Sequence, residues 1–375
     1  MEIKDLKHHL RKKKFELWFY CILVLVALST FLLVNYGISS VVNSITRTFY
    51  KVSPMDEKDV YAGTENKLSD FYFLQNEHPS DLNGAIEEQN ISGGQAAAVV
   101  IENYTPIRQL QKGLDKASVV YETLAEGGIT RFLAIFDGSP VDVIGPVRSA
   151  RPYFVTWASE YRAGLAHVGG SGEALGDIKD NFRIFNIDEM ADSQTIWRDD
   201  SLDPPHNAFT SVYNIISKLT QSRYFHPMTI DRFPFKDPDK TAGDIKTISI
   251  DFSLEPYAVK YVFDPATSTY SRYNGGVLNK DVKPSDIIVQ FVDSQVLDSA
   301  GRLRIQTNGT GNALVFRDGK VVEGTWEKDS SINSDSQPMD QSWTKFFDKD
   351  GKEIQLNRGQ IWIEVVPNGR TVNYF

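Results

Sequence analysis

The sequence contains very little cysteine and little histidine. Of its 375 residues, one is cysteine (Cys21) and six are histidine. A single cysteine excludes an internal disulfide framework and any zinc site built from several thiolates. Basic residues are in the minority, with 40 Lys plus Arg against 49 Asp plus Glu and a formal net charge of −9. We therefore expect no broad binding to nucleic acid, which requires a basic surface.

Charge is also missing from one early apolar stretch. Residues 17–34 read LWFYCILVLVALSTFLLV, about the 18 residues at which a membrane span is expected. Lys and Arg side chains cluster within residues 1–14, and such a basic flank predicts a cytoplasmic N-terminus. A cleaved signal peptide is disfavoured, because no small-residue cleavage site follows the run. We predict a cytoplasmic tail over 1–16 and an uncleaved, single-pass transmembrane anchor over 17–37.

The chain beyond the anchor is predicted to lie outside the cell membrane. Residues 38–95 are polar and weakly periodic, which predicts a stalk or linker. Two folded domains are predicted after it, a mixed α/β layered domain over 96–235 and a mainly antiparallel, β-rich domain over 240–375. The fold class is therefore α+β.

The first domain is predicted from alternating strand and helix patterns. Apolar runs predict strands over 96–103, 118–124 and 130–138, and helical spacing of aromatic residues predicts a helix over 152–162. Ser171 or Gly172 is expected to cap a further helix.

The second domain has a different pattern. Its segments are short, rich in β-branched residues and separated by Gly, Asn, Asp or Pro. Asp318-Gly319 between two such segments predicts a hairpin.

Polar side chains with chemical potential gather at turn-like positions of the first domain. The candidate catalytic residues are Glu122, Glu126, His167 and His206. The candidate ligand-binding residues are Arg131, Arg148, Arg151, His167, Ser171, Trp197, Arg198, Asp199, His206 and Asn207. Residues of these types at turns and strand ends commonly form binding sites.

Three interpretations compete for these residues. In the first, the arginines bind carboxylate or phosphate in bidentate fashion, assisted by backbone N–H groups of 169–172, while Trp197 stacks on a sugar. The alternative is a purely structural role, in which each arginine pairs with a carboxylate and braces the fold by stabilising its turns.

The second interpretation is catalysis, with a serine activated by His167 or His206, or with Glu122 and Glu126 as acid and base. No G-x-S-x-G motif supports the serine route. The third is a metal site, which no H-x-x-x-H or H-E-x-x-H spacing supports. We expect no metal and no cofactor.

Several motifs together resemble one family. GLDKASVVYETLAEGGITRFLAIF, IGPVRSARPYF, AHVGGS, WRDD and PPHNAFTS occur in order, followed by NALVFRDGKVVEGTWEK and GKEIQLNRGQIWIEVVP. They are similar to the YerB-like family of exported bacterial proteins, over roughly residues 95–375. The resemblance implies a two-part extracytoplasmic module, often attached as a lipoprotein, with no catalytic residues to transfer. The candidate residues that match its motifs are Glu122, Glu126, Arg131, Arg148, Arg151, His167, Trp197, Arg198, His206 and Asn207.

We predict a membrane-anchored, extracytoplasmic binding or scaffolding module of the cell envelope, which recognises a polar or anionic, glycan-type ligand. The alternative is a hydrolase or transferase that acts on cell-wall material through Glu122 or Glu126 with His167 or His206. The sequence leaves open whether the protein is an enzyme. The expected partners are the membrane, through residues 17–37, and a cell-wall glycan or envelope protein.

Overall fold

A computed structural model describes residues 78–80, 82–87, 94–137, 139–181, 183–222, 233–328 and 343–375. The predicted tail and anchor, residues 1–37, and the first part of the predicted stalk lie outside the described residues. Within the described ranges, no helix has both the length and the apolar character to cross a membrane. All of these ranges belong to one compact unit, residues 69–375.

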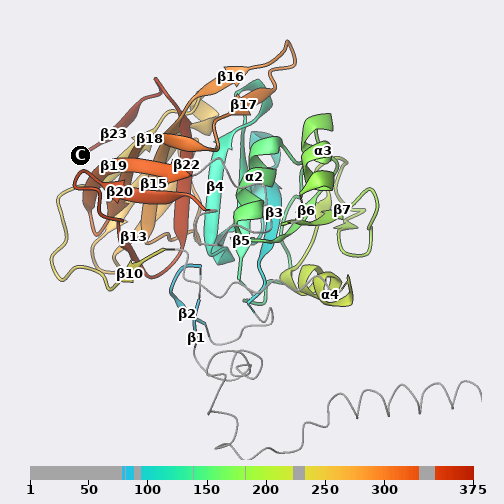
Figure 1. The fold of residues 1–375 in the computed structure, drawn as a ribbon, viewed down its shortest axis with the longest axis horizontal. Helices are drawn as coiled ribbons and strands as arrows, with labels where there is room; N and C mark the ends of the chain where they lie inside the picture. The colour runs from blue at the N-terminus through green and yellow to red at the C-terminus, as the bar shows by residue number, and fades with distance from the viewer. Residues whose placement is uncertain are drawn as a thin grey trace, which may run out of the picture. The chain divides into compact units, whose positions relative to one another are not determined.

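A ten-stranded sheet forms the centre of this unit (Figure 1). Its strand order is β20-β19-β18-β15-β22-β4-β5-β3-β6-β7. The strands are β3 (Ala97–Glu102), β4 (Val119–Leu124), β5 (Thr130–Phe136), β6 (Gly164–His167), β7 (Phe185–Asp188), β15 (Asp286–Val292), β18 (Gly309–Arg317), β19 (Lys320–Lys328), β20 (Lys345–Asp348) and β22 (Ile361–Pro367).

The sheet runs through both predicted domains without a break. Strand β22 pairs in parallel with β15 on one side and with β4 on the other. The boundary predicted near residues 235–240 therefore divides the chain but not the sheet. The second half is mainly antiparallel, as expected, and the parallel pair β15–β22 is an exception to that pattern. The reason is burial, since β22 is buried at every position and β15 at all but one, as is typical of parallel strands covered on both faces.

A second, five-stranded antiparallel sheet covers part of one face of the large sheet. Its order is β14-β13-β12-β11-β23. The strands are β11 (Thr247–Ile250), β12 (Val259–Asp264), β13 (Thr269–Asn274), β14 (Val277–Leu278) and β23 (Val372–Tyr374). We call the face beneath it the sheet-covered face.

Helices complete both layers. Helices α2 (Pro152–Glu160) and α3 (Gly172–Asp180) pack on the opposite face, which we call the helical face, and α4 (Val212–Ser222) packs on the sheet-covered face. The predicted strands over 96–103, 118–124 and 130–138 and the helix over 152–162 are confirmed within a few residues. Ser171 caps α3 as expected, by accepting a hydrogen bond from the Ala174 N–H at 3.2 Å.

Short elements fill the connections. The strands are β1 (His78–Pro79), β2 (Ile86–Glu87), β8 (Trp197–Arg198), β9 (Ala208–Phe209), β10 (Phe235–Lys236), β16 (Ser294–Val296), β17 (Leu303–Ile305) and β21 (Leu356–Asn357), and the 3-10 helices are η2 (Thr105–Leu110), η3 (Leu114–Lys116), η4 (Glu126–Gly128) and η5 (Glu255–Tyr257). The β16–β17 hairpin projects past the large sheet (Figure 1). The hairpin predicted at Asp318-Gly319 is confirmed, because these residues join β18 to β19.

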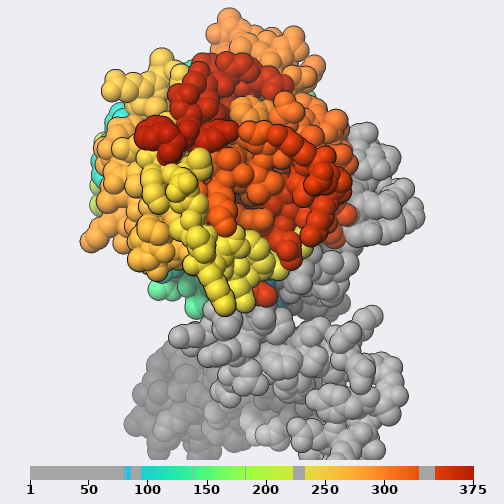
Figure 2. Space-filling model, turned by 90° about the vertical axis from the view of Figure 1, so that its left-hand side faces the viewer, coloured from blue at the N-terminus to red at the C-terminus, as the bar shows by residue number. Residues whose placement is uncertain are grey.

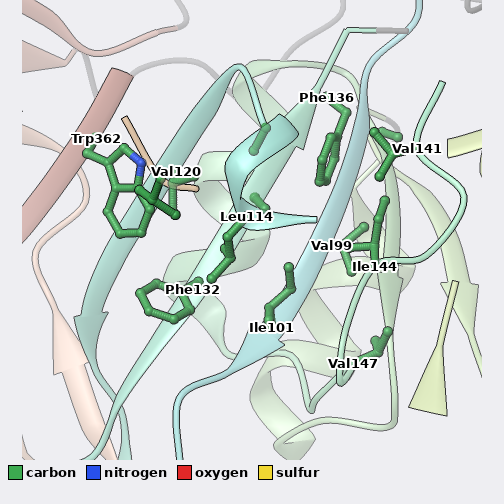
Figure 3. Packing of buried hydrophobic residues seen from close by; sticks show 14 of the residues in the cluster. Val99, Ile101, Leu114, Val120, Phe132, Phe136, Val141, Ile144, Val147 and Trp362 are labelled. Atoms are coloured by element: carbon green, nitrogen blue, oxygen red, sulfur yellow. The ribbon is translucent and has the colours of Figure 1, made fainter. Parts of the chain in front are cut away.

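Alternation along the strands divides the core into two layers. On the sheet-covered face, Val120 of β4 lies beside Trp362 of β22, and Phe132 of β5 and Ile101 of β3 follow in the order of the strands (Figure 3). The Phe132 and Trp362 rings meet edge to face at 5.6 Å between centroids. Residues one position along, such as Tyr121 of β4, point to the helical face instead and stack on Trp157 of α2. The same alternation decides where each polar side chain of these strands lies.

Candidate functional site

The carboxyl ends of seven strands lie along one edge of the large sheet, because β3, β4, β6, β7, β15, β19 and β22 run in the same direction. After β3 the chain packs Leu114 and Ala117 on the sheet-covered face, whereas after β6 it forms α3 on the helical face. Neighbouring strands whose connections turn to opposite faces open a crevice between their carboxyl ends, and ligands commonly bind there.

Residues 147–150 of the GPVRSARP motif fill this crevice with backbone. The Arg148 N–H donates to Val100 O at 2.8 Å, and the Val168 N–H donates to Arg148 O at 3.1 Å. The Ala150 N–H then donates to the carbonyl of Gly169 at 3.0 Å. Gly169 has a φ of 57°, a left-handed conformation that glycine adopts readily. The segment therefore occupies the crevice between β3 and β6 and holds the arginines of the motif at the edge of the sheet.

Glu102 organises the first group of side chains at this edge. It ends β3 and is nearly fully buried. One carboxylate oxygen lies 2.8 Å from His206 Nδ1, and the other lies 3.3 Å from Arg148 Nε. Arg148 Nη1 also donates to Pro205 O at 3.1 Å. The ring of Tyr104 stacks on His206 with centroids 5.6 Å apart.

Glu126 organises a second group beside the first. Arg151 Nε donates to its carboxylate, and Arg131 Nη2 lies 3.6 Å from its other oxygen. Arg131 is the cross-strand partner of Glu102, so both groups share the helical face. We call Glu102, Glu126, Arg131, Arg148, Arg151 and His206 together the arginine edge. With neutral histidine, its three guanidinium groups and two carboxylates sum to a charge of +1.

The surroundings shift the pKa values of Arg131 and Glu126 for different reasons. Burial, reinforced by the charge of Arg151, lowers the pKa of Arg131 to about 10. Burial raises the pKa of Glu126, but the hydrogen bond from Arg151 and the charge of Arg131 outweigh it and leave that pKa below its ordinary value. Glu126 is therefore a stable anion and a poor general acid.

His167 does not reach the surface of the arginine edge. Its side chain is 0% exposed. Nδ1 lies 2.8 Å from Gly169 O, and Nε2 lies 2.7 Å from Asn186 Oδ1. Both ring nitrogens are thus used inside the fold, which leaves no nitrogen for a substrate. Ser171, the other candidate of this loop, caps α3.

Arg198 belongs to a separate braced group. It forms two hydrogen bonds to Glu189, at 2.8 and 3.0 Å, and a third to Asn207 Oδ1 at 2.8 Å. Asp199 accepts from Ser201, and Trp197 pairs with Phe209 in the β8–β9 ladder. This matches the bracing alternative for Arg198, whose partner Asn207 follows His206 of the arginine edge in the chain.

Glu122 lies on the sheet-covered face, away from Glu126. Arg272 of β13 donates to its carboxylate and also, at 3.2 Å, to the hydroxyl of Tyr261. Tyr261 donates to Glu364, which is the register partner of Glu122 on β22. We call Glu122, Tyr261, Arg272 and Glu364 the buried carboxyl cluster. Each of its side chains is fully buried. A substrate therefore cannot reach Glu122, which rules out its predicted catalytic role beside a histidine.

Burial dominates the titration of this cluster. Burial and the charge of Glu122 raise the pKa of Glu364 well above its ordinary value, which favours the neutral carboxylic acid. Burial also lowers the pKa of Arg272, but the carboxylate of Glu122 more than compensates and keeps the guanidinium charged. The cluster then holds one anion against one cation.

Sequence analysis missed Glu102, Arg272 and Glu364. Glu102 and Glu364 could have been found, because each is an acidic residue within or ending an apolar strand run, AAVVIE and IWIEVVP. Arg272 lies in the polar run TYSRYN, which does not suggest a buried residue. It is buried only because the five-stranded sheet packs on the large sheet.

The arginine edge is partly exposed, since the side chains of Glu126, Arg148, Arg151 and His206 are 16–24% exposed. Two hollows lie elsewhere among the described residues, one of about 750 Å³ over β18–β20 and one of about 500 Å³ beside α3, and no arginine-edge residue lines either. In the same ranges, no three His, Cys, Asp or Glu side chains are placed to hold a metal ion.

Comparison with known proteins gives the relationship. Two family models match, the N-terminal domain of "protein of unknown function (DUF3048)" over residues 82–225 and its C-terminal domain over 248–363. A curated relative, "Putative lipoprotein YerB" of Bacillus subtilis, is 30% identical over 330 residues, which cover 85% of this chain and 92% of that protein. The chain belongs to the YerB-like family.

A solved YerB structure supports the fold. The crystal structure of the YerB protein from Bacillus subtilis is 29% identical to this chain and superposes with a TM-score of 0.68. It covers 80% of this chain, and the match takes in 100% of the crystallised chain. Both halves of the YerB-like module therefore occur here together and in the same order.

Proposed function

We propose that this protein is a membrane-anchored component of the cell envelope that binds a polar, anionic ligand, of glycan type, at the arginine edge. Its YerB relative is named as a lipoprotein, and the basic and apolar N-terminal segment of this chain suits the same compartment. The net negative charge of the chain repels anions in general. The three arginines of the edge give one part of the surface a local attraction for them.

The proposal rests on two guanidinium groups whose hydrogen-bond donors are only partly occupied. Among the described residues, Nη2 of Arg148 and Nη2 of Arg151 have no hydrogen-bond partner, and their side chains are 23% and 16% exposed. A guanidinium held on one side by a carboxylate is pre-oriented for an anion on the other. Tyr104, 38% exposed and stacked on His206, offers an aromatic surface beside it for a sugar ring.

Retention on purified cell-wall fractions tests the proposal. The full chain in detergent is compared with Arg148→Ala and Arg151→Ala, and with Arg358→Ala as a matched control. Arg358 is an exposed arginine just before the amino end of β22, at the sheet edge opposite the carboxyl ends. We expect the two edge variants to lose about tenfold or more in affinity, equivalent to about 1.4 kcal/mol, and the control to bind normally. Equal retention by all four proteins would contradict ligand binding at this edge.

A second function is favoured by one contact. Glu102 holds His206 Nδ1 at 2.8 Å, which is the arrangement that orients an imidazole so that Nε2 can act as a general base. We therefore retain hydrolysis or transfer on cell-wall material as the alternative, with Glu102 in place of Glu122 as the carboxylate. Mass spectrometry of wall fragments after incubation tests it. Shortened fragments that depend on both His206 and Glu102 would replace the binding proposal.

A further inference from the structure

One edge of the five-stranded sheet carries unpaired backbone groups. Among the strands of the described ranges, β23 pairs with β11 alone. Phe375 exchanges both backbone hydrogen bonds with Thr247, and Asp251 N–H donates to Thr371 O. Because bonding direction alternates along an antiparallel strand, Val372 and Tyr374 direct their N–H and C=O groups outward. Neither residue has a backbone partner on that side among the described ranges.

A hollow lies beside this edge. Its volume is about 750 Å³, and its floor is the part of β15, β18, β19 and β20 that the five-stranded sheet leaves uncovered. Figure 2 shows this face hollowed between the dark red C-terminal strand and the red-orange residues around β20. The Tyr374 hydroxyl joins edge and hollow, because it donates to Glu323 at 3.3 Å and Glu323 lines the hollow.

The lining combines apolar and acidic side chains. Phe291, Leu314 and Phe347 are half-buried on its floor. Three acidic residues, Glu323, Glu327 and Asp348, line it against one lysine, Lys349, which pairs with Glu323 at 2.6 Å. The lining therefore has a charge of −2. Glu327 lies opposite Lys345 on β20 but makes no hydrogen bond or ion pair among the described residues.

We propose that this hollow binds an extended, basic segment of a protein partner, which adds a strand to β23. Main-chain hydrogen bonds to Val372 and Tyr374 would supply the pairing, and alternate side chains would enter the hollow. Apolar residues of the segment suit Phe291 and Leu314, while Lys or Arg residues suit Glu327 and Asp348. The interaction is independent of the anion-binding arginine edge, which lies on the other face of the large sheet.

The test uses a fluorescent, end-blocked peptide of alternating Lys and Val and the full chain in detergent. Val372→Pro removes only an outward N–H, because the ladder to β11 passes through the residues on either side, and edge strands tolerate proline. Leu278→Pro is the matched control on β14, the opposite edge of the same sheet. Glu327→Lys changes the charge of the hollow without breaking an internal contact.

We expect Val372→Pro and Glu327→Lys each to weaken peptide binding by up to about tenfold, Leu278→Pro to leave it unchanged, and an alternating Glu and Val peptide not to bind. Circular dichroism verifies that each variant folds. Binding that survives both Val372→Pro and Glu327→Lys would overturn the proposal. So would a homodimer in sedimentation that Val372→Pro dissociates, since the occupant of the edge would then be a second copy of the chain.

Discussion

The arginine edge and the buried carboxyl cluster are built from the same parts and differ in their surroundings. Each brings arginine and carboxylate side chains together on the large sheet. At the edge, Arg131 lies beside Glu102 on the neighbouring strand, whereas in the cluster Arg272 of the five-stranded sheet contacts Glu122, which lies beside Glu364. At the edge the guanidinium groups remain partly exposed. In the cluster, Arg272 and both carboxyl groups are sealed between two sheets. Exposed pairs contribute little to stability and stay available to ligands, whereas a buried pair becomes costly to break.

The comparison also shows what joins the two halves of the YerB-like module. Glu122 lies in the N-terminal segment and Arg272 in the C-terminal one, so neither half can neutralise its buried charge alone. Lys328 and Glu160 repeat this pattern on the helical face, with an ion pair of 2.7 Å between β19 and α2. We infer that the two halves form one cooperative folding unit, and the following predictions test how far the buried cluster and the edge differ.

The largest effect is expected from removal of the buried cation. Arg272→Met leaves Glu122 buried without its ion partner, and we expect a loss of about 3–5 kcal/mol in the free energy of unfolding. Arg148→Met at the edge should cost less than about 1 kcal/mol. Urea denaturation measures both. Similar losses in the two variants would show that burial does not separate the two regions.

The hydroxyl of Tyr261 should have the next largest effect. It contacts both Arg272 and Glu364, so Tyr261→Phe leaves two buried polar groups short of a partner, and we expect a loss of about 1–3 kcal/mol. Tyr153→Phe is the matched control, because the Tyr153 hydroxyl makes one buried hydrogen bond, to Leu124 O at 3.2 Å. Urea denaturation should show the control as the milder variant, and the opposite order would contradict the proposed role of the cluster.

The pH dependence of stability should identify Glu364. Its pKa is raised in the folded protein, so the folded state keeps a proton that the unfolded state releases, and stability falls as pH rises from about 4.5 through the folded pKa. Asp286, whose pKa burial raises to about 7, contributes in the same direction at lower pH. From about pH 4.5 up to the folded pKa of Glu364, we therefore expect this one group to contribute a slope of up to about 1.4 kcal/mol per pH unit, which Glu364→Gln removes. Parallel curves for wild type and variant would refute a protonated Glu364.

The smallest effect is expected at the edge. The pKa of Glu126 is lowered in the folded protein, so its contribution to stability is present above its ordinary value of 4.5 and disappears as pH falls through the folded pKa. Glu126→Gln should remove this part of the acid dependence, by less than about 1 kcal/mol because the pair is partly solvated. Thermal unfolding between pH 3 and 6 measures the change, and a loss as large as that of Arg272→Met would mean that the edge is also a structural lock.

Local patterns predicted much of this fold. The runs around AAAVVIEN, SVVYETL and TRFLAIF are strands, and Ser171 begins a helix as its side chain suggested. The order of strands could not be predicted, because IWIEVVP is apolar on both faces apart from Glu364 and nothing local specifies β4 as its neighbour. For the site, turn residues indicated Arg148, Arg151 and His206, which lie along one edge of the sheet, and also His167, whose ring is buried in the fold. Alternation alone could not reveal that Glu122 faces a second sheet, since the covering strands come from residues more than a hundred positions later.

The position of β22 has a consequence for synthesis. Thr123 and Val365, joined by a hydrogen bond across β4 and β22, are 242 residues apart in sequence. Contacts of such separation form late and slow the folding of a chain. While the ribosome still holds the C-terminal segment, β4 presents an open edge and Glu122 has no cation, a state that invites wrong strand pairing. The sheet can close only after the last strands have emerged, so a truncation near the C-terminus should be more damaging than its short length suggests.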